Sequence, residues 1–378
     1  MSTIQGIRGT TNINQDRRVV DMAKDIALLE PNAAPLTVLM KQMTKSSSVK
    51  NPEYKVLTDE LSPRWDAVNG AVTSGATTIN VDNGSYFSVG DVLDVPSTGE
   101  QVLVTAIATN ALTVTRAWGT TSAAAIADNA NVRIVANASS EGDAAPTPKT
   151  ETTSTVTNYT QIIQTPFGVT GTQDASELYG GKDMVYLAKK YGIEHKKSIE
   201  SAFLLGEKKE DTSGTQPKRF TAGLNSLITT NVTDAGGTLT EAEFEAFLRT
   251  AFRYGSTTKT LFASPLLISA INSWAAGKLQ TVSKDKTYGI DVKQYLSGHG
   301  TINLIKHNLL EQDYAGVGFV VDMETIGYKY LPGRDTHLKT NIQNNDVDER
   351  KDEYLSEVGF YMTQEKSSAK IEGITDFS

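Results

Sequence analysis

Apolar residues follow a helical spacing in several parts of the chain, and the longest such stretch is 180–210. After Asp183 it contains no helix breaker except Gly192, and Asp183 or the two preceding glycines are placed to cap it. It predicts a helix of roughly 25 residues, whereas helices of globular domains average about 11–12. The predicted apolar stripe is Met184, Leu187, Ala188, Tyr191, His195, Ile199, Ala202 and Phe203. The predicted polar face is Lys189, Lys190, Glu194, Lys196, Lys197 and Glu200. Such a helix is typical of a stiff framework.

Shorter helices are predicted on both sides of this long one. The first of them ends before Pro31, since proline disfavours helical geometry in the residue that precedes it. Thr240 and Glu243 have the spacing of a capping box, and Gly277 is placed to end the last helix. The predicted ranges are 16–29, 35–43, 238–255 and 266–277.

Between 69 and 136 the helical pattern gives way to short β-branched runs separated by turn sequences such as DNGS and STGE. Five short strands of this kind predict a small barrel or sandwich, inserted into the chain with its ends close together. The five runs are 77–81, 91–95, 101–107, 111–115 and 132–135.

The segments that flank this insertion, 51–68 and 137–171, have the pattern of extended chain. In the first, charged residues interrupt Tyr54, Val56 and Leu61, and the second begins with a Thr-rich stretch poor in large apolar residues. Together they predict a two-stranded arm. Because such a pair of strands is only marginally stable alone, the arm is expected to need a partner surface.

The rest of the chain alternates helix and strand, which predicts an α+β fold with a small central sheet. Its strands are predicted at 260–265, 301–308 and 316–331, with a pair of strands at 351–374.

Composition narrows the possible functions. The 378 residues include no cysteine, which excludes disulfides, thiolate catalysis and Cys-ligated zinc. The net charge of −8 gives no overall basic character for nucleic-acid binding. No apolar run approaches the roughly 18–20 residues that span a bilayer, and the N-terminal sequence lacks the apolar core of a signal peptide. A protein made and used in a cytoplasm, or released from it by lysis, is expected.

A search for catalytic or metal-binding patterns finds no site. The four histidines, His195, His299, His307 and His337, lack metal-ligand spacing, and a packed position on the long helix is expected for His195. The acidic runs 346–353 and 206–211 lack EF-hand spacing and are interpreted as solvated charge. We therefore predict no catalytic, cofactor-binding or metal-binding residues and no cofactor.

The order of the parts resembles the major capsid protein of tailed bacteriophages with the HK97-like fold. Five stretches make the resemblance more specific: LLEPNAAPLTVLMKQM (28–43), VLTDELSPRWDAVN (56–69), YFSVGDVLDV (86–95), LTVTRAWGTTSAAAIADNANVRIV (112–135) and GGKDMVYLAKKYGIEHKKSIESAFLLG (180–206). In these stretches the chain resembles the SU10-type major capsid subfamily, which carries a β domain inserted in its extended loop.

The resemblance implies domain assignments and a structural role. The implied domains are an N-terminal arm (1–50), an extended E-loop arm (51–68 and 137–171), an inserted β-barrel or β-sandwich (69–136), the spine helix with the peripheral domain (172–224), an axial-type α+β domain (225–345) and C-terminal peripheral-domain strands (346–378). The implied function is self-assembly into the icosahedral head shell of a double-stranded DNA phage.

The resemblance also implies partners and a location. The chain would form pentamers and hexamers, and would meet scaffolding, portal and decoration proteins encoded on separate chains. It would enclose double-stranded DNA without reading its sequence, would not enter a membrane, and would assemble in the bacterial cytoplasm before residing in the virion. Some relatives crosslink a lysine to an asparagine, but no such pair can be matched here.

Three alternatives remain open from the sequence. An encapsulin-like compartment would have the same fold, a surface adhesin would use 69–136 to bind glycans, and a hydrolase would use a dispersed acidic site. If the chain is a capsid protein, we expect 69–136 to project outward from the shell. We also expect deletion of the arm to leave a folded subunit that cannot close shells, and Leu187→Asp to unfold the subunit.

Overall fold

The computed structural model describes residues 34–43, 46–142, 148–150, 152–176, 182–274, 279–280 and 293–377. The helix predicted at 16–29 and the helix end predicted at Gly277 lie outside these residues. The chain forms two compact units, one of residues 1–56 and 155–378 and the other of residues 57–154.

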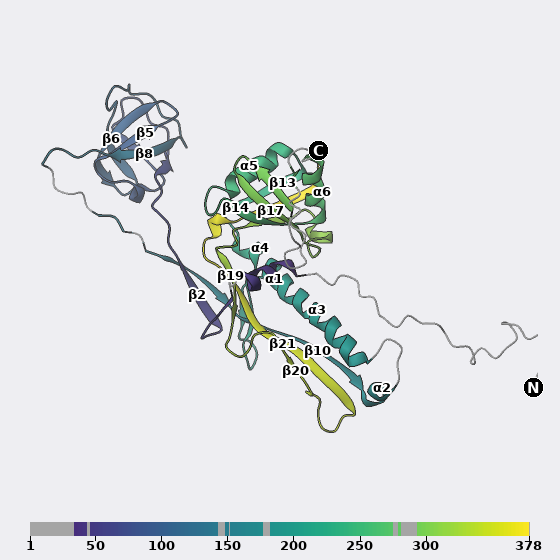
Figure 1. Ribbon diagram of the computed structural model, residues 1–378. Helices are drawn as coiled ribbons and strands as arrows, with labels where there is room; N and C mark the ends of the chain where they lie inside the picture. Colours follow the sequence, from purple (N-terminus) through teal and green to yellow (C-terminus); the bar gives the residue numbers. More distant parts are fainter. Residues whose placement is uncertain are drawn as a thin grey trace, which may run out of the picture. The chain divides into compact units, whose positions relative to one another are not determined.

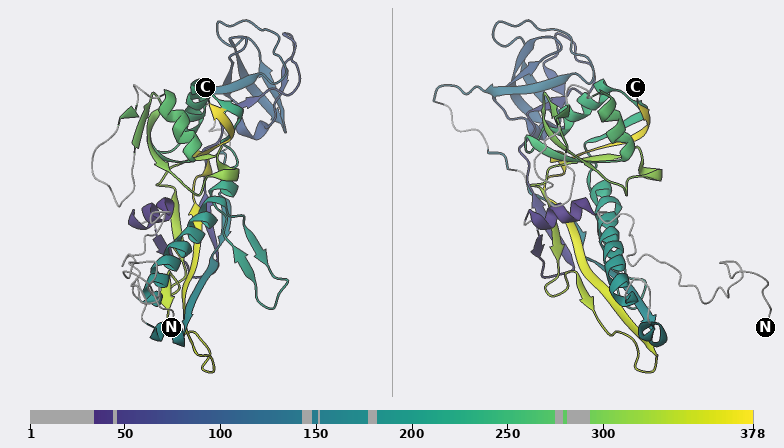
Figure 2. Two further views of the ribbon diagram at one scale, coloured as in Figure 1. Left: turned by 90° about the vertical axis from the view of Figure 1, so that its right-hand side faces the viewer. Right: turned by 45° about the vertical axis from the view of Figure 1, so that its right-hand side comes forward.

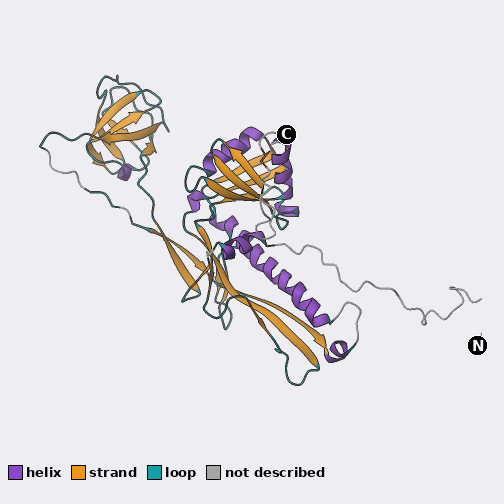
Figure 3. Ribbon diagram, in the orientation of Figure 1, coloured by secondary structure: helices purple, strands orange, loops and turns teal. Residues whose placement is uncertain are grey.

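The first sheet of the larger unit runs beside the long helix α3 (Asp183–Leu205), as Figures 1 and 3 show. Its central strand β21 (Glu349–Met362) pairs antiparallel along its length with β10 (Gln161–Thr170), so that the two form a long ribbon against α3. The sheet is completed by β19 (Ile326–Tyr330), β1 (Ser46–Ser48) and β20 (His337–Lys339).

The long helix matches the prediction in position and length but not in its first residues. Its N-cap is Lys182, whose side chain makes no capping hydrogen bond, whereas Asp183 lies inside the first turn. There its negative charge faces the positive end of the helix dipole. Gly192, the one helix breaker in the stretch, is explained by packing, since a Cβ atom there would lie 3.2 Å from the Tyr354 hydroxyl.

The second sheet of this unit is mixed and is covered by α5 (Glu241–Ala251) and α6 (Pro265–Trp274). The predicted capping box of Thr240 and Glu243 is present at the start of α5. Along β14, Phe262 packs into the core below α3, while its neighbours Leu261 and Ala263 pack under α5 and α6. The strand order is β13 (Val232–Leu239), β22 (Ala369–Phe377), β18 (Gly318–Val321), β14 (Thr258–Ala263), β17 (Gly300–Lys306), β16 (Lys293–Ser297) and β15 (Leu279–Gln280).

The C-terminal strands differ from the predicted pair at 351–374. β21 and β22 do not pair with each other, because β21 lies in the first sheet and β22 in the second. The predicted division at 345/346 is therefore not respected either, since β22 joins the sheet assigned to 225–345 and β19 leaves it. Strand periodicity reports which residues face a core, but it does not report which sheet a strand enters.

Short elements fill the remainder of this unit. They are α1 (Pro35–Gln42), α2 (Gly171–Ala175), α4 (Leu224–Leu227), the hairpin β11 (Lys209–Asp211) and β12 (Lys218–Phe220), and the arm strands β2 (Glu53–Thr58) and β9 (Ser154–Tyr159). β2 and β9 pair only with each other. The arm predicted over 137–171 extended too far, because β10 pairs with β21 in the first sheet and so belongs to the body of the unit.

The smaller unit is a β domain built around an apolar core of its own. All five predicted strands are present, and the sheet also takes β3 (Trp65–Ala67), a segment that the sequence had placed in the arm. Asp66 in the middle of β3 is buried, and its carboxylate accepts a hydrogen bond from the Asn83 amide, which fastens this strand to the β domain. The strand order is β3, β8 (Asn131–Asn137), β5 (Asp91–Val95), β6 (Glu100–Ala108), β7 (Ala111–Thr115) and β4 (Thr78–Asn80).

Candidate functional site

The N-terminal helix α1 is held on α3 by one buried carboxylate. Glu200 Oε1 accepts a hydrogen bond from the Leu36 amide at 2.6 Å, and its Oε2 accepts from the Thr37 amide at 2.8 Å and from the Thr37 hydroxyl. These amides belong to the first turn of α1, where no helical partner exists and where the helix dipole favours a negative charge. Figure 2 shows α1 against the C-terminal half of α3.

His307 completes this anchor from the opposite side. Its Nε2 lies 2.8 Å from Glu200 Oε1, and both side chains are fully buried. His307 comes directly after β17, so the anchor joins α1, α3 and the second sheet. Leu36 and Met40 on the inner face of α1 lie fully buried in the core below α3. Buried polar groups are stable only when paired, and this cluster is fully paired.

Glu200 was predicted to lie on the exposed face of α3, and this prediction is wrong. The residue does share a face with Lys196, which precedes it by four positions and is exposed. Helix α1 covers that face only near the C-terminal end of α3, so Glu200 is buried there. No signal near Glu200 in the sequence reveals its partners, which lie 163 and 107 residues away.

The two-stranded arm is fixed at its root by Tyr54 and Asn158. The Tyr54 hydroxyl donates to the Phe360 carbonyl oxygen at 2.5 Å, and Asn158 Nδ2 donates to the same oxygen at 2.6 Å. The Ala222 amide donates to Asn158 Oδ1 at 2.8 Å. Gly359 permits this approach, because a Cβ atom there would lie 2.6 Å from the Tyr54 hydroxyl. The arm therefore leaves the sheet from a rigid base.

Beyond its root, the arm carries exposed apolar side chains. Leu57 is 69% exposed and Leu61 is 96% exposed. The larger unit has further exposed apolar side chains at Val185 on α3, Ile162 on β10 and Phe220 on β12. Scattered apolar residues are normal on any surface, but a leucine exposed almost completely just beyond the end of β2 is typical of a chain that meets a partner.

His195 is a packed residue, as predicted from the sequence. Its Nδ1 lies 2.8 Å from the Thr165 hydroxyl and its Nε2 lies 2.6 Å from the Ser356 hydroxyl, so it links α3 to both strands of the ribbon. Burial lowers the pKa of His195 to about 4, and the positive charge of Lys41 acts in the same direction. The ring is therefore neutral near pH 7 and has a structural role.

A buried lysine closes the C-terminal end of α5. Lys259 Nζ donates to the carbonyl oxygens of Ala251 at 2.6 Å, Tyr254 at 2.7 Å and Ser367. Burial lowers the pKa of Lys259 to about 8, although the charge of Asp322 opposes this shift. Because all three donor positions are used within the fold, this lysine satisfies carbonyl groups that a helix end leaves unpaired.

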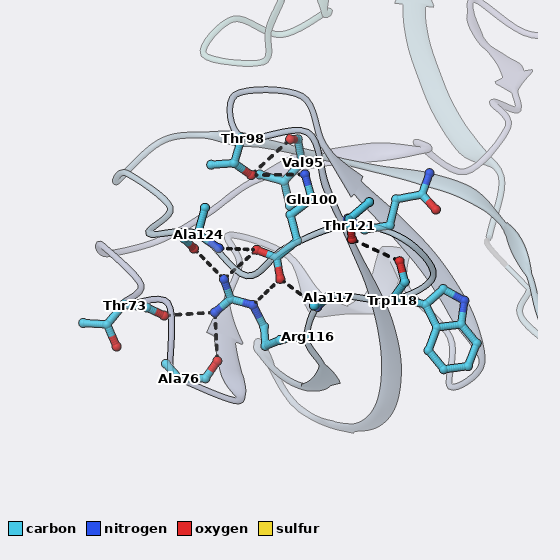
Figure 4. A network of polar contacts seen from close by, with 11 residues as sticks. Thr73, Ala76, Val95, Thr98, Glu100, Arg116, Ala117, Trp118, Thr121 and Ala124 are labelled. Atoms are coloured by element: carbon cyan, nitrogen blue, oxygen red, sulfur yellow. Dashed lines mark hydrogen bonds and ion pairs between the residues drawn. The ribbon is translucent and has the colours of Figure 1, made fainter.

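The β domain is stabilised by an ion pair between Glu100 and Arg116, shown in Figure 4. The guanidinium donates to both carboxylate oxygens, at 2.8 and 2.7 Å, and to the carbonyl oxygens of Thr73, Ala76 and Ala124. Burial raises the pKa of Glu100, but its hydrogen bonds from Arg116 and two backbone amides outweigh burial and hold the pKa below its usual value. This network ties the loop between β3 and β4 and the loop between β7 and β8 to the start of β6.

The remaining candidates for chemistry do not come together. His299 is exposed in a turn, and His337 Nδ1 lies 2.7 Å from the Asp335 carbonyl oxygen. Asp352, within the acidic run 346–353, is buried and accepts the Asn341 amide. Across the residues that the structure describes, no group of three or more His, Asp and Glu side chains is placed to hold a metal ion. No helix in this part of the chain is long and apolar enough to cross a membrane.

The described chain thus combines a stiff helix beside a long ribbon, an anchored N-terminal helix and a rooted arm. The model of the SU10 major capsid protein family matches residues 5–375, and the chain belongs to this family. It is 22% identical over 355 residues to the major capsid protein of Pseudomonas phage PaMx41, covering 90% of this chain and 85% of that protein.

Two solved structures share the HK97-like fold. The encapsulin SrpI of Synechococcus elongatus has a TM-score of 0.51 at 10% identity, covering 98% of this chain and 96% of the encapsulin. The capsid of a native GTA particle has a TM-score of 0.51 at 8% identity, covering 96% of this chain and 97% of that one. At this identity the likeness shows the fold alone, whereas the family match favours a phage capsid over the encapsulin alternative.

Proposed function

We propose that this capsid protein forms pentamers and hexamers that close into an icosahedral shell around double-stranded DNA. The observation that supports this most directly is the rooted arm, whose base is fixed by Tyr54 and Asn158 while Leu57 and Leu61 remain exposed. Apolar side chains exposed on such a rooted arm are stabilised when another molecule buries them. In a shell, that molecule is the adjacent subunit.

Each part has a role in this proposal. Strands β2 and β9 act as the E-loop and reach the adjacent subunit, α3 acts as the spine, and the two sheets act as the peripheral and axial domains. The β domain at 57–154 folds on its own core and is displayed outward, where a neighbouring subunit or a decoration protein meets it. Scaffolding and portal proteins are separate partners, and assembly takes place in the host cytoplasm.

No catalytic step is assigned to the chain. Its buried ionisable groups, including Glu200, His195 and Lys259, are all hydrogen-bonded within the fold. The alternative of a hydrolase with a dispersed acidic site predicts turnover by the purified protein. The adhesin alternative predicts glycan binding by the β domain in the absence of a shell.

Electron microscopy of the expressed protein, alone and with the other head proteins of the phage, tests the proposal. Closed shells of uniform diameter are expected, with the protein as the main component of purified heads. A protein that stays strictly monomeric in virion preparations, or is absent from heads, would refute it. Limited proteolysis of intact shells with mass mapping tests the display of the β domain, and protected loops at 57–154 together with early cuts at 225–345 would contradict it.

A further inference from the structure

Helix α3 carries a face rich in lysine along most of its length. Lys182, Lys189 and Lys196 are seven residues apart, so they share one side of the helix, and all three are exposed. The side that meets the ribbon is different, since Tyr191 stacks on Phe167 with ring centroids 5.6 Å apart. We call the side of α3 that is turned away from the ribbon the lysine face. It consists of Lys182, Lys189, Lys190, Lys196 and Lys197.

Within the described part of the chain, these three exposed lysines have no acidic partner. Among the residues that the structure describes, no ion pair or side-chain hydrogen bond involves Lys182, Lys189 or Lys196. Other lysines of the same unit do have acidic partners: Lys41 pairs with Asp335, Lys339 with Glu353 and Lys370 with Glu372. Three such lysines therefore line one side of a single helix, in a chain whose net charge is −8.

Glu200 does not offset the positive charge of the lysine face. It is the acidic residue closest to the centre of that face, but it is buried, and both of its carboxylate oxygens accept hydrogen bonds from α1 or His307. Two acidic residues lie toward the edge of this side: Asp183, which accepts a hydrogen bond from Gln173 Nε2 at 2.7 Å, and the exposed Glu194, one helical turn from Lys190 and Lys197. Toward solvent the face is therefore predominantly basic, and it attracts polyanions.

We infer that the lysine face binds the phosphate backbone of double-stranded DNA. Lys182 to Lys196 span about 21 Å along the helix at 1.5 Å per residue, the length of about six base pairs at 3.4 Å each. Lysine is a point-charge donor to phosphate, and α3 contains no Arg, Asn or Gln, the residues that most often read base edges. The contact is therefore independent of sequence, as packaging of a whole genome requires.

This inference rests on the proposed function, because it takes DNA to be the polyanion inside the shell. Two other partners of the lysine face have to be separated from DNA: the N-terminal segment 1–33 and an acidic protein. Residues 1–33 of the same chain contain four basic residues (Arg8, Arg17, Arg18 and Lys24) and four acidic ones (Asp16, Asp21, Asp25 and Glu30), so they carry no net charge to complement it. An acidic protein partner is the second, and the experiment separates it from DNA.

The test measures binding of unassembled full-length subunits to a fluorescent 30-base-pair duplex of arbitrary sequence, by anisotropy at several salt concentrations. The variant Lys182→Gln/Lys189→Gln/Lys196→Gln is compared with the control Lys208→Gln/Lys209→Gln/Lys218→Gln. The control removes the same charge from exposed lysines near the β11–β12 hairpin. We expect the first variant to bind at least tenfold more weakly at low salt. The slope of log affinity against log salt concentration should become less negative by about 3, because three phosphate contacts are lost. The control should match the parent.

Each other result overturns the inference. Equal affinity of parent and lysine-face variant would show that the face does not bind DNA. Loss of binding to a polyglutamate peptide, with DNA binding unchanged, would assign the face to an acidic protein. DNA binding that appears only after deletion of 1–33 would show that the chain covers its own lysines. Shell formation is scored separately by electron microscopy, so a parent that forms no shells contradicts the proposed function, whatever its DNA affinity.

Discussion

His307 Nε2 and Glu200 Oε1 lie 2.8 Å apart with neither side chain exposed to solvent, and the same carboxylate holds the first turn of α1. Glu200 therefore connects the N-terminal segment, the spine helix and the second sheet at one point. A single carboxylate that satisfies four donors cannot be removed without leaving several buried groups unpaired. The structure thus makes Glu200 the residue on which docking of α1 most depends.

Replacement of this carboxylate is the first prediction. Glu200→Ala should lower the free energy of unfolding by about 3–5 kcal/mol, since it leaves buried amides and the His307 ring without their acceptor. It should also release α1, so that trypsin cuts at Lys41 sooner. Glu194→Ala, on an exposed position of the same helix, should change stability by no more than about 0.5 kcal/mol. Equal melting of both variants would contradict the role given to Glu200.

The second prediction concerns acid. The pKa of His195 is about 4 in the folded chain, whereas an unperturbed histidine, as in the unfolded chain, has a pKa of 6.5. Between these pH values the unfolded chain therefore binds more protons than the folded chain. Stability should therefore fall as pH is lowered from 6.5 through 4, with a slope of at most about 1.4 kcal/mol per pH unit from this residue. His195→Gln should melt at a lower temperature at pH 7 but with a flatter dependence in this window. Denaturant titrations at pH 4.5, 5.5 and 7 measure both slopes, and parallel curves would exclude His195 as the cause.

A third prediction separates the β domain from the rest of the fold. Arg116→Met removes the only described ion-pair partner of the buried Glu100 and takes a hydrogen-bond donor from three carbonyl groups, of which Thr73 still accepts from the Ala76 amide. Loss of one member of a buried pair costs about 3–5 kcal/mol, so the β domain should become sensitive to protease. The larger unit has its own cores and should keep its melting transition. The control is Arg64→Met, which replaces an exposed arginine of the same domain. If Arg116→Met lowered the melting temperature of both units, the two units would fold together and the prediction would be wrong.

The spine helix tests what sequence periodicity can predict. The expectation that Leu187→Asp unfolds the subunit took Leu187 as buried, but it is only half-buried, whereas Phe203 is fully buried against Tyr328 and Phe360. We now expect Phe203→Asp to abolish the cooperative melt, because it buries a carboxylate without a partner, and Leu187→Asp to be milder. Circular dichroism melting distinguishes them, and equal loss in both variants would restore the earlier expectation.

Comparison of the predicted with the observed elements shows which features of the fold can be predicted from the sequence. The long helix, the five strands of the β domain and the capping box of α5 were predictable because each depends on residues near one another in the chain. Burial of Glu200 and the separation of β21 from β22 were not, because they depend on partners more than 100 residues away or on the choice between two sheets. Periodicity indicates that a face is covered, but it does not indicate where along a helix the covering element ends.

The last prediction concerns the arm, where folding and assembly should separate. Leu57 and Leu61 contribute little to the folded subunit, since they are 69% and 96% exposed. Leu57→Asp/Leu61→Asp should therefore change the free energy of unfolding by no more than about 0.5 kcal/mol. If the adjacent subunit buries both leucines, each adds about 1.5–3 kcal/mol to that contact, and two charges there should prevent closed shells. Sedimentation measures shells and circular dichroism measures folding.

The control for the arm keeps its apolar character. Leu57→Met/Leu61→Met should assemble like the parent, because methionine buries a similar area and fills irregular contacts. Normal shells from the aspartate variant would show that the arm does not carry the contact between subunits. A fall in its melting temperature as large as that of Glu200→Ala would instead place the two leucines in the subunit's own core. Only a folded subunit that fails to close shells, beside a methionine variant that succeeds, supports the division between an anchored body and a rooted arm that reaches out to the next molecule.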